Sequence, residues 1–152
     1  MRFTKKGVMI GFDGRHKRGH IYRSILEAVA LTMKKHVTDM TNEIGVNLDK
    51  IIITGGGSNS DLFMQIFADV FNIPMVRNEV NGAAGLGSAI CAAVAAGVYK
   101  SFDEAVENMV RIKDTFTPNP EAVAFYEKMY PVYTNITKHT DEVLKEAYEL
   151  FN

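Results

Sequence analysis

A glycine-rich turn is the part of this 152-residue sequence whose residue types and spacing most clearly suggest chemistry. It directly follows the β-branched run Lys50–Thr54 and reads Gly55-Gly56-Gly57-Ser58-Asn59-Ser60. A strand that ends in glycines and opens a helix presents bare backbone N–H groups beside the positive end of the helix dipole, which suits phosphate oxygens. Because glycine has no Cβ, a ligand can approach this backbone closely. A tight turn with positive φ would need only one or two glycines, so the triad favours a ligand-binding turn.

Other arrangements of potentially reactive residues are less specific. The chain has no G-x-x-x-x-G-K-[ST] phosphate loop, and Gly82–Gly87 lacks the G-x-G-x-x-G order of dinucleotide-binding folds, so its glycines are interpreted as sites of close helix packing. His16 and His20 are four residues apart, but no third metal ligand is evident, and we interpret them as surface or interface histidines. We predict no catalytic and no metal-binding residue in this chain.

Composition limits the partners and the location of the protein. The formal net charge of −1 gives no electrostatic reason to expect nucleic acid or a membrane as a partner. The single cysteine, Cys91, excludes an internal disulfide and indicates a reducing compartment. The N-terminus lacks the apolar stretch of a signal peptide, so a cytoplasmic protein is expected. The uncharged run Gly82–Tyr99 has nearly the length of a membrane span, but its alanines and glycines favour a tightly packed interior helix.

Hydrophobic periodicity predicts one α/β domain, residues 1–152, with a mainly parallel sheet. The expected strands are Gly7–Phe12, Lys50–Thr54, buried on both faces, and Pro74–Arg77. The first helix is expected from about Gly19 to a left-handed cap at Gly45, and the second begins after an N-cap at Ser58 or Asn59. The third is expected from Asn81-Gly82 to Gly97, the fourth after Ser101, and the last after Asn119, with Pro120 at its first position. The second helix is expected to bury Leu62, Phe63, Ile66, Phe67, Val70 and Phe71. The chain beyond Gly97 is expected to be entirely helical.

Two details of the long helices can also be predicted. Arg23 and Glu27 are spaced to form an ion pair on one helix face. Pro131 is expected to kink the last helix, in which three tyrosines share a face that we interpret as packing, with hydroxyls at its boundary: Tyr126, Tyr130 and Tyr133.

Three stretches in this order resemble motifs of the FGGY carbohydrate kinases. Gly7–Phe12, followed after seven residues by His20–Glu27, is similar to the second signature of that family, with Phe12 in place of the usual aliphatic residue. Gly55–Asp69 resembles the adenosine motif, a glycine turn followed by a helix that contains Gln65 and Ala68-Asp69. Glu79–Ala89 resembles the small-residue helix that follows it. The resemblance covers essentially the whole chain.

The resemblance implies a ribonuclease H-like, actin-type ATPase domain that is incomplete and carries long C-terminal helices. Gly55, Gly56 and Gly57 would then lie against the phosphates and ribose of ATP or ADP. Ser60 occupies a place where relatives often hold an adenine-contacting Asn, and Asn59 is the alternative contact. Mg²⁺ is expected only in the full-length kinase.

The same resemblance implies that much of a kinase is missing. The catalytic Asp, the sugar pocket and the first phosphate loop belong to an N-terminal domain, and a phosphate hairpin opens the C-terminal domain. The sequence is therefore expected to be the nucleotide-binding part of an ATP-dependent carbohydrate kinase, present as a fragment or a truncated gene product and inactive by itself; a stand-alone nucleotide-binding or interaction module is the alternative. Without the hairpin, Lys50–Thr54 exposes a strand edge. We expect either a homodimer, which we favour, or a shift of Gly7–Phe12 into the vacant place.

Overall fold

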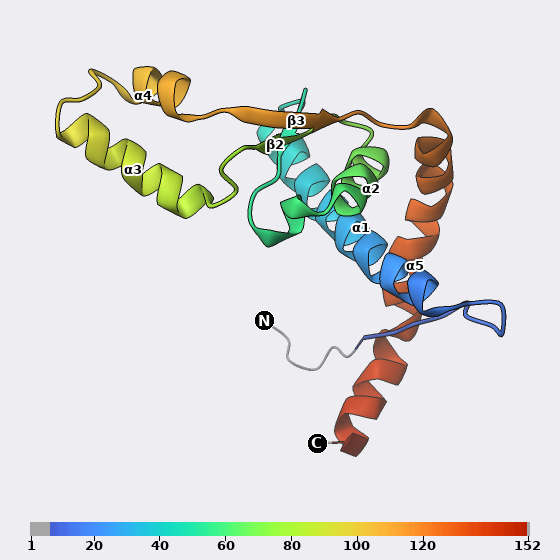
Figure 1. Cartoon of the computed structure of the whole chain (residues 1–152). Coiled ribbons are helices and arrows are strands. Elements are labelled where there is room, and N and C mark those ends of the chain that lie inside the picture. Colours follow the sequence, from blue (N-terminus) through green and yellow to red (C-terminus); the bar gives the residue numbers. More distant parts are fainter. Residues whose placement is uncertain (1–6, 152) are drawn as a thin grey trace.

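The computed structural model describes residues 7–151 and contains five α-helices, three strands and one short 3₁₀ helix in that range. The helices are α1 (Arg18–Ile44), α2 (Asp61–Phe71), α3 (Ala83–Ala95), α4 (Phe102–Met109) and α5 (Pro120–Phe151). The strands are β1 (Ile51–Ile52), β2 (Met75–Asn78) and β3 (Ile112–Phe116), and the 3₁₀ helix η1 is Gly56–Asn59. The part described is helix-rich around a small sheet (Figure 1).

The sheet has the strand order β1-β2-β3 and is mixed. β1 pairs with β2 in parallel, and β2 pairs with β3 antiparallel, with Met75 opposite Phe116. The prediction of Pro74–Arg77 as a strand is confirmed with a shift of one residue. Within Lys50–Thr54 only Ile51 and Ile52 form a strand. Ile52 is exposed, so the predicted burial of this strand on both faces is wrong. In the described sheet β1 has a neighbour on one side only, which explains both its shortness and this exposure.

Two predictions about strands are wrong. Gly7–Phe12 is not a strand: it is an exposed segment, and Gly11 takes a φ of 82°, which interrupts an extended run. A strand also needs a paired neighbour, and this segment pairs with no strand of the described sheet. The chain beyond Gly97 is not entirely helical, because β3 lies between α4 and α5 and completes the sheet.

The core lies between α1, α2 and α5 (Figure 1). The left-handed cap of α1 at Gly45 (φ 68°) is confirmed. α2 buries most of its residues because its apolar positions recur every three to four residues; of its predicted apolar side only Leu62 is exposed. Tyr126 of α5 packs among the buried residues Ala30, Leu31, Met64, Ile66, Phe67, Ala68, Val70, Phe71 and Met75.

The start of α5 follows the predicted capping pattern. The Asn119 Oδ1 accepts hydrogen bonds from the N–H groups of Glu121 (2.9 Å) and Ala122 (3.4 Å), and Pro120 is the first helical residue. The helix continues through Pro131.

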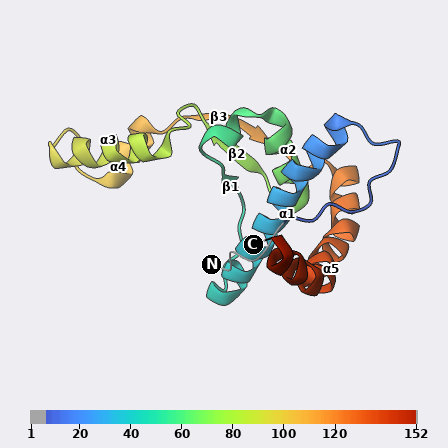
Figure 2. The ribbon, with the colours of Figure 1, turned by 90° about the horizontal axis from the view of Figure 1, so that it is seen from below.

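The interior position predicted for the Ala-rich helix is wrong. α3 and α4 pack mainly against each other and project away from α1, α2 and α5 (Figures 1 and 2). Ile90 is the buried residue of α3 and Ala105 that of α4. Small side chains permit close packing between helices, but they do not determine whether the helix lies in the interior of the domain or at its surface. Among the described residues, no helix combines the length and apolar character needed to cross a membrane.

Candidate nucleotide-binding loop

The six residues singled out in the sequence form a compact loop between β1 and α2. The Gly55 N–H donates to the carbonyl of Asn81 (2.9 Å), and η1 begins immediately after Gly55. Ser58 is fully buried, and both its Oγ (2.7 Å) and its N–H (3.1 Å) donate to the Gly55 carbonyl. The predicted cap at Ser58 or Asn59 is wrong, because the extra turn of η1 moves the N-cap of α2 to Ser60, whose Oγ accepts from the Phe63 N–H (3.3 Å).

The three glycines meet different requirements. Gly55 has φ 85° and ψ −175°, a conformation that is essentially restricted to glycine. At Gly57 a Cβ would lie 2.8 Å from the Phe63 ring, so a side chain there would require the ring to shift. Gly56 has neither a positive φ nor any atom within 4 Å of an added Cβ. Folding therefore explains two of the glycines and leaves Gly56 unexplained.

The loop also carries open backbone donors. Gly56 and Gly57 are exposed, and within the described part of the chain their N–H groups donate to no protein acceptor. The exposed Asn59 side chain, in contrast, is engaged: its Oδ1 accepts from the Asn81 Nδ2 (2.8 Å). Asn81 thus stabilises the loop through two hydrogen bonds: its carbonyl accepts from the Gly55 N–H, and its side-chain amide donates to Asn59.

Arg77 of β2 is a residue of this region that the sequence analysis did not identify. Its NH1 donates to the Ser58 carbonyl (2.8 Å) and lies 2.9 Å from the Asp61 Oδ1. Its Nε donates to the Asp114 Oδ1 (2.8 Å), and its NH2 to the other oxygen of that carboxylate. The guanidinium lies over the Phe116 ring, 5.1 Å from its centroid. Arg77 holds the pKa of Asp114 below its usual value through these hydrogen bonds.

Gln65 and Asp69, two residues of the adenosine-like motif, lie at the joint between α2 and α5. The Asp69 Oδ1 accepts from the Gln65 Nε2 (2.8 Å) and from the Asn119 N–H (2.8 Å). The Gln65 Nε2 also donates to the Thr117 carbonyl (2.9 Å). In this structure the pair fixes the entry of the chain into α5.

The other candidate residues are not brought to the loop. The predicted ion pair is present, with the Arg23 Nε 2.8 Å from the Glu27 Oε1, on α1. The rings of His16 and His20 lie edge to face with centroids 5.6 Å apart. Among the described residues no group of three or more His, Cys, Asp or Glu side chains could hold a metal ion.

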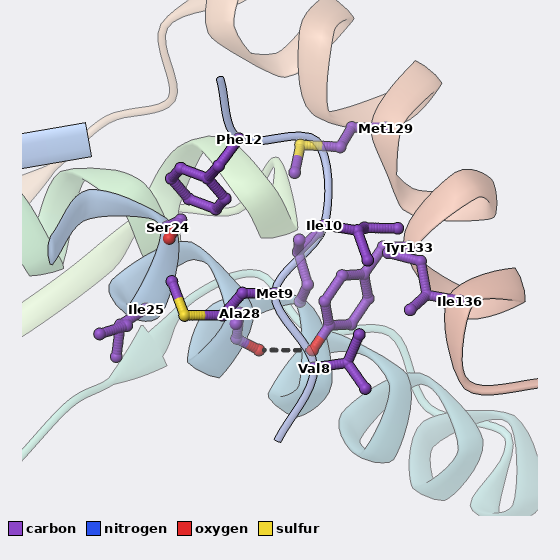
Figure 3. Close-up of a pocket in the computed structure, with 11 residues that line it drawn as sticks. Val8, Met9, Ile10, Phe12, Ser24, Ile25, Ala28, Met129, Tyr133 and Ile136 are labelled. Carbon is purple, nitrogen blue, oxygen red and sulfur yellow. Dashed lines mark hydrogen bonds between the residues drawn. The ribbon is translucent and has the colours of Figure 1, made fainter. Parts of the chain in front are cut away.

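A separate apolar cavity of about 160 Å³ lies where the Val8–Phe12 segment crosses α1 and α5 (Figure 3). The Tyr133 hydroxyl donates to the Ala28 carbonyl (3.1 Å) at this place. The lining contains no charged side chain and no residue of the glycine loop, so the cavity offers nothing to a phosphate; its residues are Val8, Met9, Ile10, Phe12, Ser24, Ile25, Ala28, Leu31, Met129, Tyr133 and Ile136.

Three known proteins to which the chain is similar are named as kinases of sugars or polyols. The chain is 52% identical over 149 residues to the uncharacterized sugar kinase YgcE of Escherichia coli K12, covering 97% of this chain and 30% of that protein. The xylulose kinase of Rhodospirillum rubrum superposes with a TM-score of 0.75 at 29% identity, over 89% of this chain and 27% of the other. The glycerol kinase of Plasmodium falciparum, solved with ADP, superposes with a TM-score of 0.76 at 20% identity, over 90% and 27%.

These relatives are much longer, and this chain spans about 30% of the length of YgcE. The sequence model described as "FGGY family of carbohydrate kinases, C-terminal domain" matches residues 4–96, more than half of the chain. The chain therefore belongs to the FGGY family of carbohydrate kinases, within the C-terminal domain.

Proposed function

We propose that this chain is the nucleotide-binding part of an ATP-dependent carbohydrate kinase that transfers the γ-phosphate of ATP to a hydroxyl of a sugar or polyol. Membership of the family supports the reaction class. The share of the relatives that the chain spans supports its being one part of such an enzyme. The proposed fold of that whole domain is the ribonuclease H-like, actin-type ATPase fold.

The observation that carries the proposal is the pair of free N–H groups at Gly56 and Gly57. They sit on exposed glycines at the start of η1, which leads into the N-terminus of α2, and backbone donors at the start of a helix favour an anion. In the proposed complex Gly55, Gly56 and Gly57 lie against the phosphates and ribose of ATP or ADP. Ser58 and Ser60 support the loop through their internal hydrogen bonds, and Asn59 is the residue whose exposed amide can reach the adenine.

The reaction itself needs groups beyond this loop. In-line phosphoryl transfer requires a base or orienting group for the attacking hydroxyl, a metal ion and clamps on the γ-phosphate. The described residues provide no cluster for Mg²⁺, and we propose that the ion is bound through the nucleotide and by residues of the longer kinase. The chain alone then binds nucleotide without transferring phosphate. A stand-alone binding module is the second candidate, and an upstream open reading frame with an Asp-x-Gly phosphate loop would decide between the two.

We also propose a cytoplasmic homodimer, with no nucleic acid or membrane partner. The free edge of β1 and a row of exposed apolar side chains on α1 support self-association; the row contains Ile21, Ile25, Val29, Met33, Met40 and Ile44.

Titration of the ¹⁵N-labelled chain with ADP tests nucleotide binding. We expect weak binding, with amide shifts centred on Gly55–Asp61, because the enclosing parts of the site lie outside this chain. Gly56→Ala should weaken binding without unfolding the protein, whereas the control Gly14→Ala, at another glycine with open space around its Cβ, should not. No shifts at millimolar ADP, or shifts confined to other regions, would reject the site.

A further inference from the structure

The Arg77 guanidinium is buried and makes a hydrogen bond to the glycine loop in addition to its ion pairs. Arg77 is 5% exposed and follows two buried apolar residues of β2, Met75 and Val76. A buried cation is costly unless it is paired and hydrogen-bonded. The bidentate contact with Asp114 of β3 meets that need. The additional hydrogen bond from NH1 to the Ser58 carbonyl is therefore not required for neutralisation.

That additional bond fixes the inner side of the glycine loop. It holds the Ser58 carbonyl towards β2, while the Ser58 hydroxyl and N–H both hold the Gly55 carbonyl. The free N–H groups of Gly56 and Gly57 lie in the chain between these two anchored carbonyls. The direction in which the donors point thus depends on a side chain that does not line the open face of the loop.

The contribution of Arg77 is geometric rather than electrostatic. Its single positive charge faces two carboxylates, Asp61 and Asp114, both in ion-pair contact with it. Asp61 is 77% exposed, so water screens that pair strongly, but Asp114 alone already balances the arginine. The cluster consequently offers no net positive charge to an anion bound at the loop.

We infer that Arg77 is a positioning residue for nucleotide phosphates, acting through Ser58 on the N–H groups of Gly56 and Gly57. This inference rests on the function proposed above. A lysine would keep the charge but lacks the planar fork that serves Asp114 from two nitrogens while a third contact reaches Ser58. Arg77→Lys therefore separates the geometry of the side chain from its charge.

The test compares wild type, Arg77→Lys and the control Arg23→Lys, which makes the same exchange in an ion pair on α1. Amide spectra without ligand report the conformation of the loop, and an ADP titration reports its function. We expect Arg77→Lys to shift the amides of Gly56, Gly57 and Asn59 in the free protein and to weaken ADP binding about tenfold, the equivalent of one charge-assisted hydrogen bond. Arg23→Lys should change neither reading.

The two proposals fail in different ways. Absence of ADP binding by wild type would reject the nucleotide site. Loop amides that stay unshifted in Arg77→Lys, or ADP affinity that stays unchanged although wild type binds, would overturn the positioning role. Should Arg77→Lys fail to fold, Asp114→Asn loosens the same guanidinium from its half-exposed partner. The shift of the loop amides and the loss of ADP affinity are then both expected, each smaller than in Arg77→Lys, and their absence would equally overturn the inference.

Discussion

Tyr126 of α5 donates its hydroxyl hydrogen to the Oε1 of Glu27 on α1 across 2.8 Å. The same carboxylate oxygen accepts from the Arg23 Nε at 2.8 Å, and the Arg23 NH2 lies 3.3 Å from the tyrosine oxygen. Three side chains thus join two helices that are about a hundred residues apart in the sequence. Burial, followed by the neighbouring Glu27, raises the pKa of Tyr126 to about 12; the arginine opposes this rise.

The joint should make the protein sensitive to alkali. Because the folded pKa of Tyr126 lies above its ordinary value of 10.0, the unfolded chain loses this proton first, and stability should fall as pH rises from about 10 towards 12. Denaturant melts across that range should show the loss, and tyrosinate absorbance should show one late-titrating tyrosine. In Tyr126→Phe the late titration should vanish; if it persists, another residue is responsible.

The glycine triad should separate folding from binding. Gly55→Ala should destabilise the protein by about 1–3 kcal/mol, because its backbone conformation is nearly restricted to glycine. Gly57→Ala should also destabilise it by crowding Phe63, whereas Gly56→Ala should change stability by no more than about 0.5 kcal/mol. Urea unfolding measures all three, and an equal loss at Gly56 would show that this glycine too is needed for folding.

We predict that the chain alone has no measurable ATP-dependent kinase activity towards pentoses, ketoses, polyols or aldonates. The physical reason is that a nucleotide loop cannot activate the attacking hydroxyl or clamp the γ-phosphate. A coupled assay for ADP release over a panel of these acceptors provides the measurement. Phosphorylated product that disappears in Gly56→Ala would contradict the prediction, since trace contaminating kinases would not respond to that change.

Analytical ultracentrifugation at micromolar concentration should show a dimer. Ile52→Lys should shift it towards monomer, because a charge on a strand edge opposes pairing with another edge. Val143→Lys replaces another exposed apolar residue, on α5, and should leave the dimer intact. A wild-type monomer whose Lys50–Thr54 amides resist hydrogen exchange would instead indicate that the edge is covered within one chain.

The elements that the sequence predicts well are those whose limits are decided locally. Gly45 ends α1 through its own φ, and Asn119 with Pro120 starts α5 through bonds to the next residues. The position of the glycine turn belongs to the same class, since Gly55 and the contact between Gly57 and Phe63 are local, whereas the hydrogen bonds from Asn81 and Arg77 that hold the turn come from farther along the chain.

The strands and contacts that the sequence did not predict depend on partners distant in the chain. Gly7–Phe12 has the composition of a strand but lacks a neighbour in the described sheet, and β3 exists because β2 offers it an edge. Arg77 was missed for a related reason. An arginine at the end of an apolar strand is a visible signal, but its partners Ser58 and Asp114 are 19 and 37 residues away, and only the fold unites them.

The arm formed by α3 and α4 leaves and re-enters the sheet at one place. Asn78 at the end of β2 pairs with Ile112 at the start of β3, and the Glu79 N–H donates to the Arg111 carbonyl (2.9 Å) just outside that pair. The two ends of the arm are therefore joined by backbone hydrogen bonds, like the two strands at the base of a β-hairpin. A change in the length of these two helices would therefore not have to alter the pairing of β2 with β3, because the chain leaves and rejoins the sheet at the same pair of residues.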